Sequence, residues 1–200
     1  MQPKNGKIME ITASIVSVGS WNPRIFTPEW VSTNVFSMPE GDTMNIALNE
    51  KQMNLTYAWK GIQLLMTDRG IEMKTDAKSM DVLIQMEEIY KHLYEVLPFT
   101  PITAVGYNLN LTLAKDEFEK TKIAGIIKPQ TIDVYTSNSQ TFSAVKDGAI
   151  RSFDVRTSGS VAEIRCNFHY VTPPKGQDGT SIFKIIITEL ANFLGYELTF

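Results

Sequence analysis

The sequence predicts an α+β protein, in which antiparallel sheet carries two amphipathic helices on one face. Apolar residues over 80–97 recur at steps of three and four, which is typical of a helix with one buried side. Residues 105–113 alternate strictly between apolar and polar, as expected for a half-buried strand. The order of strand, loop, meander and helix then occurs twice along the chain, which predicts two similar halves.

The first half contains a leading strand, a loop rich in aromatic residues and proline, and a four-stranded meander. The expected strands are 11–18, 43–49, 53–59, 62–66 and 71–74. Lys60 and Gly61 predict a tight hairpin turn, because glycine supplies the positive φ. Asp76 and Ser79 are both candidate N-caps for the helix over 80–97, and Pro98 and Pro101 end it.

The second half repeats this order after the strand over 105–113. Residues 115–122 predict a charged helical turn with Phe118 pointing inward. The expected meander strands are 131–136, 141–145, 149–157 and 161–171. An amphipathic helix is predicted over 181–194, with Gly195 at the position of a left-handed C-cap.

These blocks predict a single α+β domain over residues 1–200, with pseudo-repeat halves at about 8–98 and 99–200. The short stretches 16–19 and 103–106, each a strand ending in Val-Gly, begin the comparable blocks. An internal duplication explains this order. Few residue identities link the two halves, so halves of independent origin are the alternative.

Composition excludes several classes of protein. The formal charge is −3, which argues against a coat protein that binds nucleic acid non-specifically through many lysines and arginines. A single cysteine excludes an intrachain disulfide and zinc sites built from several thiolates. No apolar run approaches the roughly 20 residues of a membrane span. The first residues lack the apolar segment of a secretory signal, so a cytoplasmic location is expected.

No catalytic, metal-binding or cofactor-binding pattern is found in the sequence. Cys166 and His169 are the one candidate nucleophile and base, but their odd separation along a strand places them on opposite faces. Gly19 and Gly106 are single glycines and do not form a phosphate-binding loop. The sequence therefore predicts no catalytic residue, no metal and no cofactor.

A cationic set in the second meander is the first candidate binding surface. Three of the five arginines lie there, and the candidate anion-binding residues are Arg151, Arg156, Arg165 and His169. Such a set suits an anionic ligand or a nucleic-acid backbone. The alternative is a solvated sheet face whose arginines pair with carboxylates on neighbouring strands.

The loop over 21–36 is the second candidate surface. Its candidate interface residues are Trp21, Arg24, Phe26, Trp30 and Phe36. Aromatic residues and arginine are enriched in binding hot spots, and two prolines stiffen the loop. The alternative is that the loop folds back and caps one end of the sheet.

The sequence favours a non-enzymatic protein-binding or assembly module, a subunit of a homo- or hetero-oligomeric complex. The first alternative is a nucleic-acid-binding accessory protein that uses the arginines of the second meander. A small-molecule enzyme with a site between sheet and helices is the third possibility.

Overall fold

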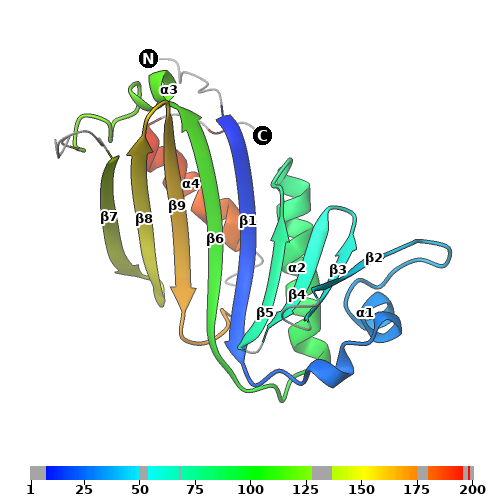
Figure 1. The fold of residues 1–200 in the computed structure, drawn as a ribbon. Helices are drawn as coiled ribbons and strands as arrows, with labels where there is room; N and C mark the ends of the chain where they lie inside the picture. Colours follow the sequence, from blue (N-terminus) through cyan, green and yellow to red (C-terminus); the bar gives the residue numbers. More distant parts are fainter. Residues whose placement is uncertain are drawn as a thin grey trace. The chain divides into compact units, whose positions relative to one another are not determined.

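Nine antiparallel strands form one open sheet in this computed structural model, which describes residues 8–49, 54–67, 69–127, 137–174, 180–195 and 198. The strand order is β2-β3-β4-β5-β1-β6-β9-β8-β7, and four α-helices accompany the sheet in these ranges (Figure 1). This architecture confirms the α+β class with antiparallel sheet.

The chain divides into two compact units. The first comprises the described parts of Met1–Thr12, Tyr107–His169 and Gly176–Phe200, and the second comprises Ala13–Gly106 and Tyr170–Lys175. Strand β1 (Ile8–Gly19) and strand β6 (Ile102–Ala114) each contribute residues to both units.

In the second unit, β1 pairs with the last strand of the meander. The meander strands are β2 (Asn45–Asn49), β3 (Asn54–Trp59), β4 (Ile62–Thr67) and β5 (Gly70–Thr75). Their register places Ile15 opposite Met73, Met73 opposite Leu64, and Leu64 opposite Tyr57. All four side chains are buried, so they lie on the face of the sheet that forms the core of this unit.

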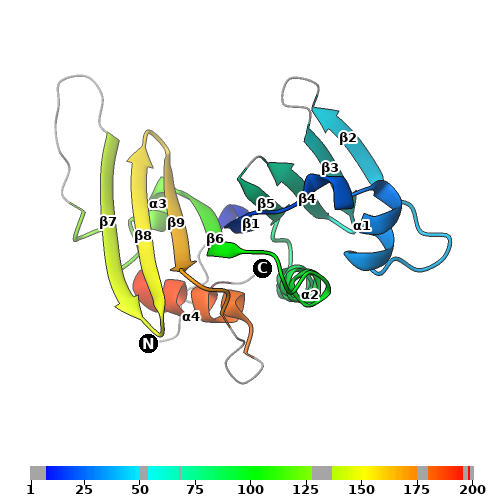
Figure 2. The ribbon, with the colours of Figure 1, turned by 90° about the horizontal axis from the view of Figure 1, so that it is seen from below.

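Helix α2 (Met80–Val96) begins at Ser79, whose side chain accepts a hydrogen bond from the Val82 amide; this identifies Ser79 rather than Asp76 as the N-cap. The helix buries one apolar side, and the Tyr90 hydroxyl lies 3.1 Å from the Ser17 hydroxyl of β1. Figure 2 views α2 nearly end-on, on one side of β4 and β5. Between β1 and β2 lie the 3-10 turn η1 (Pro23–Ile25) and helix α1 (Pro28–Asn34).

In the first unit, β6 pairs with β9 (Val161–Tyr170), followed in the sheet by β8 (Ala149–Ser158) and β7 (Ser137–Lys146). Helix α4 (Ile182–Leu194) packs on these strands through aromatic rings. The Phe183 and Tyr107 rings lie 5.7 Å apart, and the Phe193 ring stacks on Phe153 at 4.7 Å.

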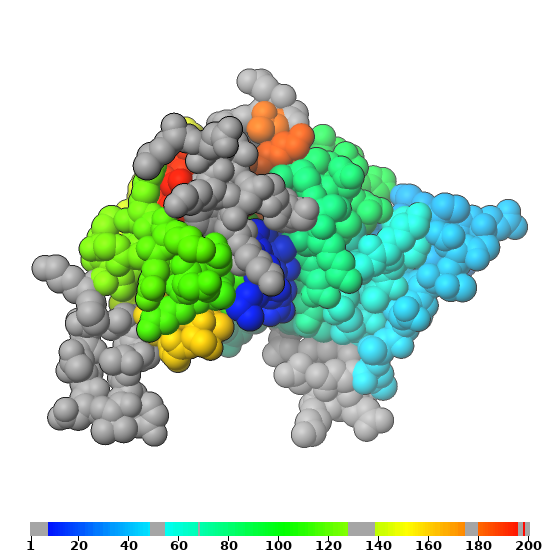
Figure 3. Space-filling model, turned by 90° about the horizontal axis from the view of Figure 1, so that it is seen from above, coloured from blue at the N-terminus to red at the C-terminus, as the bar shows by residue number. Residues whose placement is uncertain are grey.

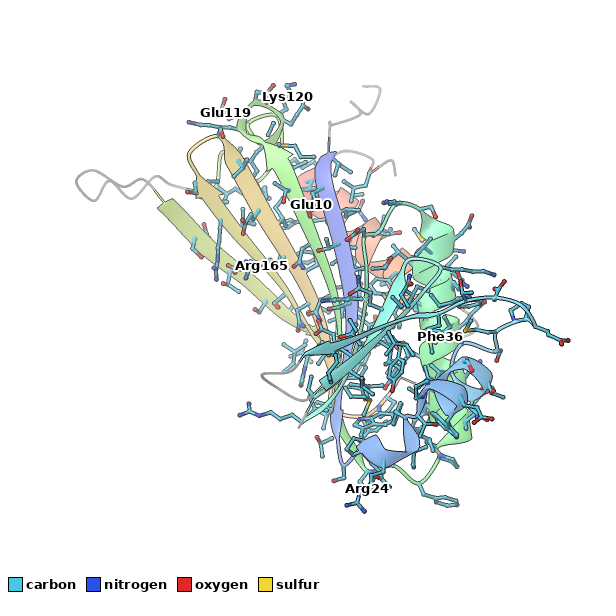
Figure 4. The ribbon with its side chains drawn as sticks, turned by 45° about the vertical axis from the view of Figure 1, so that its right-hand side comes forward. Glu10, Arg24, Phe36, Glu119, Lys120 and Arg165 are labelled. Atoms are coloured by element: carbon cyan, nitrogen blue, oxygen red, sulfur yellow. The ribbon has the colours of Figure 1, made fainter. Side chains whose placement is uncertain are left out.

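Helix α3 (Lys115–Phe118) follows β6 directly. The Lys115 amide donates to the Ser160 carbonyl at 2.9 Å, and Phe118 is buried, as the sequence predicted. The charged residues Glu119 and Lys120 are exposed at this end of the unit, where α3 is coloured green (Figures 3 and 4).

Most predicted elements are present with small shifts in their bounds. The helix predicted over 80–97 ends at Val96, with Leu97 as its C-cap, and Gly195 closes α4 with a φ of 84°. The strands expected from 11 to 74 correspond to β1 to β5, and those over 105–113 and 141–171 to β6 to β9. The strand predicted over 131–136 lies outside the described residues.

Candidate protein interface

The aromatic loop predicted as an interface is largely core. Trp21, Phe26 and Phe36 are 8%, 3% and 3% exposed, and the Tyr57 hydroxyl donates a hydrogen bond to the Phe26 carbonyl. Trp30 is half-buried, with its ring 5.2 Å from that of Phe26. This corrects the expectation that these aromatic side chains form a surface for a partner. They cover their own sheet, because burying large rings stabilises the fold.

Arg24 is the one residue of that predicted set that is exposed. It lies in η1, where its amide bonds to the Asn22 side chain at 3.1 Å. Figure 4 shows its side chain pointing away from the ribbon. No ion pair joins Arg24 to a carboxylate among the residues that the structure describes.

Arg151 does not share a surface with the other arginines. Its side chain is 4% exposed, and its guanidinium forms ion pairs with Glu189 of α4 and with Asp147. The guanidinium carbon also lies 4.7 Å from the centre of the Phe168 ring. The expectation of an exposed anion-binding Arg151 is therefore corrected. Arg151 and Arg156 are five positions apart on β8, and because this step is odd, their side chains face opposite sides of the sheet.

The other two arginines of the predicted anion-binding set are exposed but paired. Arg156 Nε lies 3.1 Å from Asp154, and the Arg165 guanidinium lies 3.3 Å from Glu163 (Figure 4 labels Arg165). His169 is half-buried. Each of the two arginines thus has a carboxylate two residues away on its own strand, so the pair contributes no excess positive charge to this face.

The one cysteine of the chain, the candidate nucleophile, is buried. Burial raises the pKa of the Cys166 thiol, so the sulfur stays protonated and non-nucleophilic near neutral pH. Within the described ranges, no three His, Cys, Asp or Glu side chains gather closely enough to hold a metal ion.

Phe99 is the surface feature that the sequence reading missed. It is 94% exposed, more than any other large apolar side chain that the structure describes. It sits in a tight turn of residues 97–100, here called the Phe99 turn, between the end of α2 and β6. The Thr100 amide donates to the Leu97 carbonyl at 3.1 Å, and Pro98 has its φ fixed by its ring. The Phe99 side chain is therefore exposed on a turn whose backbone is restricted by Pro98 and by the Thr100 hydrogen bond.

The end of β1 holds the residues that follow the Phe99 turn in place. The Ser20 amide donates to the Pro101 carbonyl at 3.0 Å, and the Thr103 hydroxyl lies 3.3 Å from the Val18 carbonyl. A Cβ at Gly19 would lie only 2.4 Å from the Pro101 oxygen, so this close approach requires glycine. The segment that leads into η1 therefore lies beside the Phe99 turn (Figure 1).

Comparisons with known proteins leave the family open: no family model matches the sequence, and no curated protein matches it. In the described part of the chain, no helix combines the length and the apolar character that crossing a membrane requires.

Proposed function

We propose that this chain is a non-enzymatic protein-binding or assembly module that docks through the Phe99 turn. The observation that carries the proposal is a phenylalanine that is 94% exposed between two prolines. Burying such a side chain contributes about 1.5–3 kcal/mol, and aromatic anchors are typical of binding hot spots. A turn already fixed in one shape also loses little entropy on docking.

The structure gives less support to the nucleic-acid alternative. A phosphate-binding face needs unpaired cations, whereas Arg151, Arg156 and Arg165 each form an ion pair with a carboxylate. Arg24 is an exposed arginine in η1, shortly after the segment that lies beside the Phe99 turn. It is better suited to an interface, where arginine is enriched.

The proposal is tested by replacing Phe99 with serine and comparing the variant with wild type as bait in extracts of the native host. We expect Phe99→Ser to lose an associated protein or to lower the mass of a self-assembly. Val145→Ser is the matched control, because Val145 is 81% exposed on the first unit and lies in no proposed surface. Wild type and Phe99→Ser with the same associated proteins and the same mass would contradict the proposal.

We also propose that the chain arose by internal duplication, with α2 and α4 in equivalent places on one face of the sheet. In both halves the leading strand pairs with the last strand of the following meander, β1 with β5 and β6 with β9. In both halves, the helix that follows the meander contacts the leading strand. Tyr90 of α2 contacts Ser17 of β1, and Phe183 of α4 contacts Tyr107 of β6. An experimental structure in which superposing α2 on α4 leaves β1 and β6 apart would contradict this origin.

A further inference from the structure

The surface beside Phe99 carries negative charge from the end of α2. Pro98 has no N–H to donate to the Tyr94 carbonyl, and the Thr100 amide bonds to Leu97 instead of Val96. The C-terminus of a helix carries a partial negative charge, and the last turn of α2 contains no basic residue to offset it. Glu95 in this turn is exposed and adds a full negative charge.

The other neighbour of the Phe99 turn carries positive charge. Pro101 accepts the hydrogen bond from Ser20, and the chain continues from Ser20 into η1 with its exposed Arg24. The Phe99 turn thus lies between an acceptor-rich helix end, which precedes it in the chain, and a segment that leads to the exposed Arg24.

This arrangement is self-complementary, which is what an interface between two identical copies requires. In a two-fold interface, the same patch serves on both sides, and each positive group meets the negative group of the other copy. We propose that two copies of this chain associate through the Phe99 turn, with Phe99 against the partner's Phe99. Arg24 of each copy then faces Glu95 and the α2 end of the other. This inference rests on the proposed function and identifies the partner that docks on the Phe99 turn as a second copy of the chain.

A stable interface has to bury more surface than the two Phe99 side chains alone can provide. Specific complexes bury about 1,200–2,000 Å² in total, several times what two phenylalanine rings supply. The end of α2 and η1 therefore have to form the surrounding contact, and the rings supply its centre.

The first experiment measures the mass of the purified chain of residues 1–200 by sedimentation equilibrium over a wide range of concentrations. We expect wild type to form dimers, and Phe99→Ser to raise the dissociation constant at least about tenfold. Val145→Ser should behave as wild type. A wild type that remains monomeric at every concentration overturns the dimer, while the bait experiment still tests the proposed function separately.

A charge exchange then tests the predicted pairing. Arg24→Glu and Glu95→Arg should each weaken the dimer at least about tenfold, because each places like charges opposite one another. The double variant carrying both changes should associate more tightly than either single variant. Glu88→Arg is the matched control, since Glu88 is an exposed glutamate two turns earlier on α2. A dimer that is unchanged by both single substitutions, or a double variant weaker than both, overturns the proposed pairing.

Discussion

The Tyr57 hydroxyl donates a hydrogen bond to the backbone carbonyl of Phe26, which ties the aromatic loop to strand β3. Both residues are buried, so this carbonyl has lost contact with water and depends on the hydroxyl. Burial also raises the pKa of Tyr57, which keeps the donor protonated at ordinary pH. One side chain thus links the loop before α1 to the middle of the meander.

Replacing Tyr57 with phenylalanine tests this link. The ring is retained, but the Phe26 carbonyl is left buried without its donor. We expect the free energy of unfolding to fall by about 1–3 kcal/mol in urea titrations. Association should be unchanged when measured where both proteins are folded. A Tyr57→Phe variant as stable as wild type would show that this carbonyl finds another donor.

Arg151 gives a second stability prediction. Arg151→Met removes the guanidinium that pairs with Glu189, a side chain only 23% exposed, and should cost about 1–3 kcal/mol. Lys146 contacts the same carboxylate at 3.0 Å but is 60% exposed, so Lys146→Met should cost less than about 1 kcal/mol. Equal losses for the two variants, measured by urea unfolding, would contradict the structural role assigned to Arg151.

Tyr90 predicts a specific loss of stability at alkaline pH. Burial, the largest cause, raises the pKa of Tyr90 from 10.0 to about 12, although its hydrogen bond with Ser17 lowers it. Between these values the unfolded chain has lost the phenolic proton and the folded chain has kept it. The contribution is therefore complete below pH 10 and is lost as the pH rises toward 12.

The comparison of wild type with Tyr90→Phe isolates this effect, because other titrating groups are common to both proteins. Urea unfolding between pH 8 and about 11.5 should show the wild type losing stability more steeply, by up to about 1.4 kcal/mol per pH unit. Parallel pH profiles for the two proteins would exclude a Tyr90 pKa above its ordinary value.

Gly19 allows the support of Phe99 to be disturbed without touching Phe99. In Gly19→Ala, the new methyl group would clash with the Pro101 carbonyl, and the Ser20 hydrogen bond to that carbonyl should be strained. We expect weaker association together with a lower melting temperature. Gly125→Ala is the control, because nothing lies within 4 Å of a Cβ at that position. If Gly19→Ala folds and associates as tightly as wild type, then association does not depend on the shape of the Phe99 turn.

The regular elements follow from the sequence because their signals are local. The apolar spacing of α2, the serine before it and the proline after it all act within a few residues. The alternation along β9 likewise predicts which side chains are buried: Ile164, Cys166 and Phe168 are all at most 1% exposed. A periodic pattern sets the face of an element even when its neighbours are unknown.

The candidate site was harder to predict, because exposure depends on neighbours distant in the chain. The aromatic residues around Trp21 have no periodic pattern, and their burial depends on β3, whose Tyr57 lies 31 residues beyond Phe26. The Arg151 position was predictable, since alternation along β8 separates it from Arg156. The signal for Phe99 lies in Pro98 and Pro101, which end the helix and also bracket the exposed phenylalanine.

The pairing of β1 with β5 has a consequence for the way this chain is made. Val18 pairs with Gly70 and Ala13 with Thr75, so the partner of β1 is synthesised roughly 50–60 residues later. At ribosomal rates of about 5–20 residues per second, β1 waits for some 3–12 seconds after it emerges. During that time it is a β-branched segment with both edges unpaired, which is the kind of segment that nascent-chain chaperones protect from aggregation.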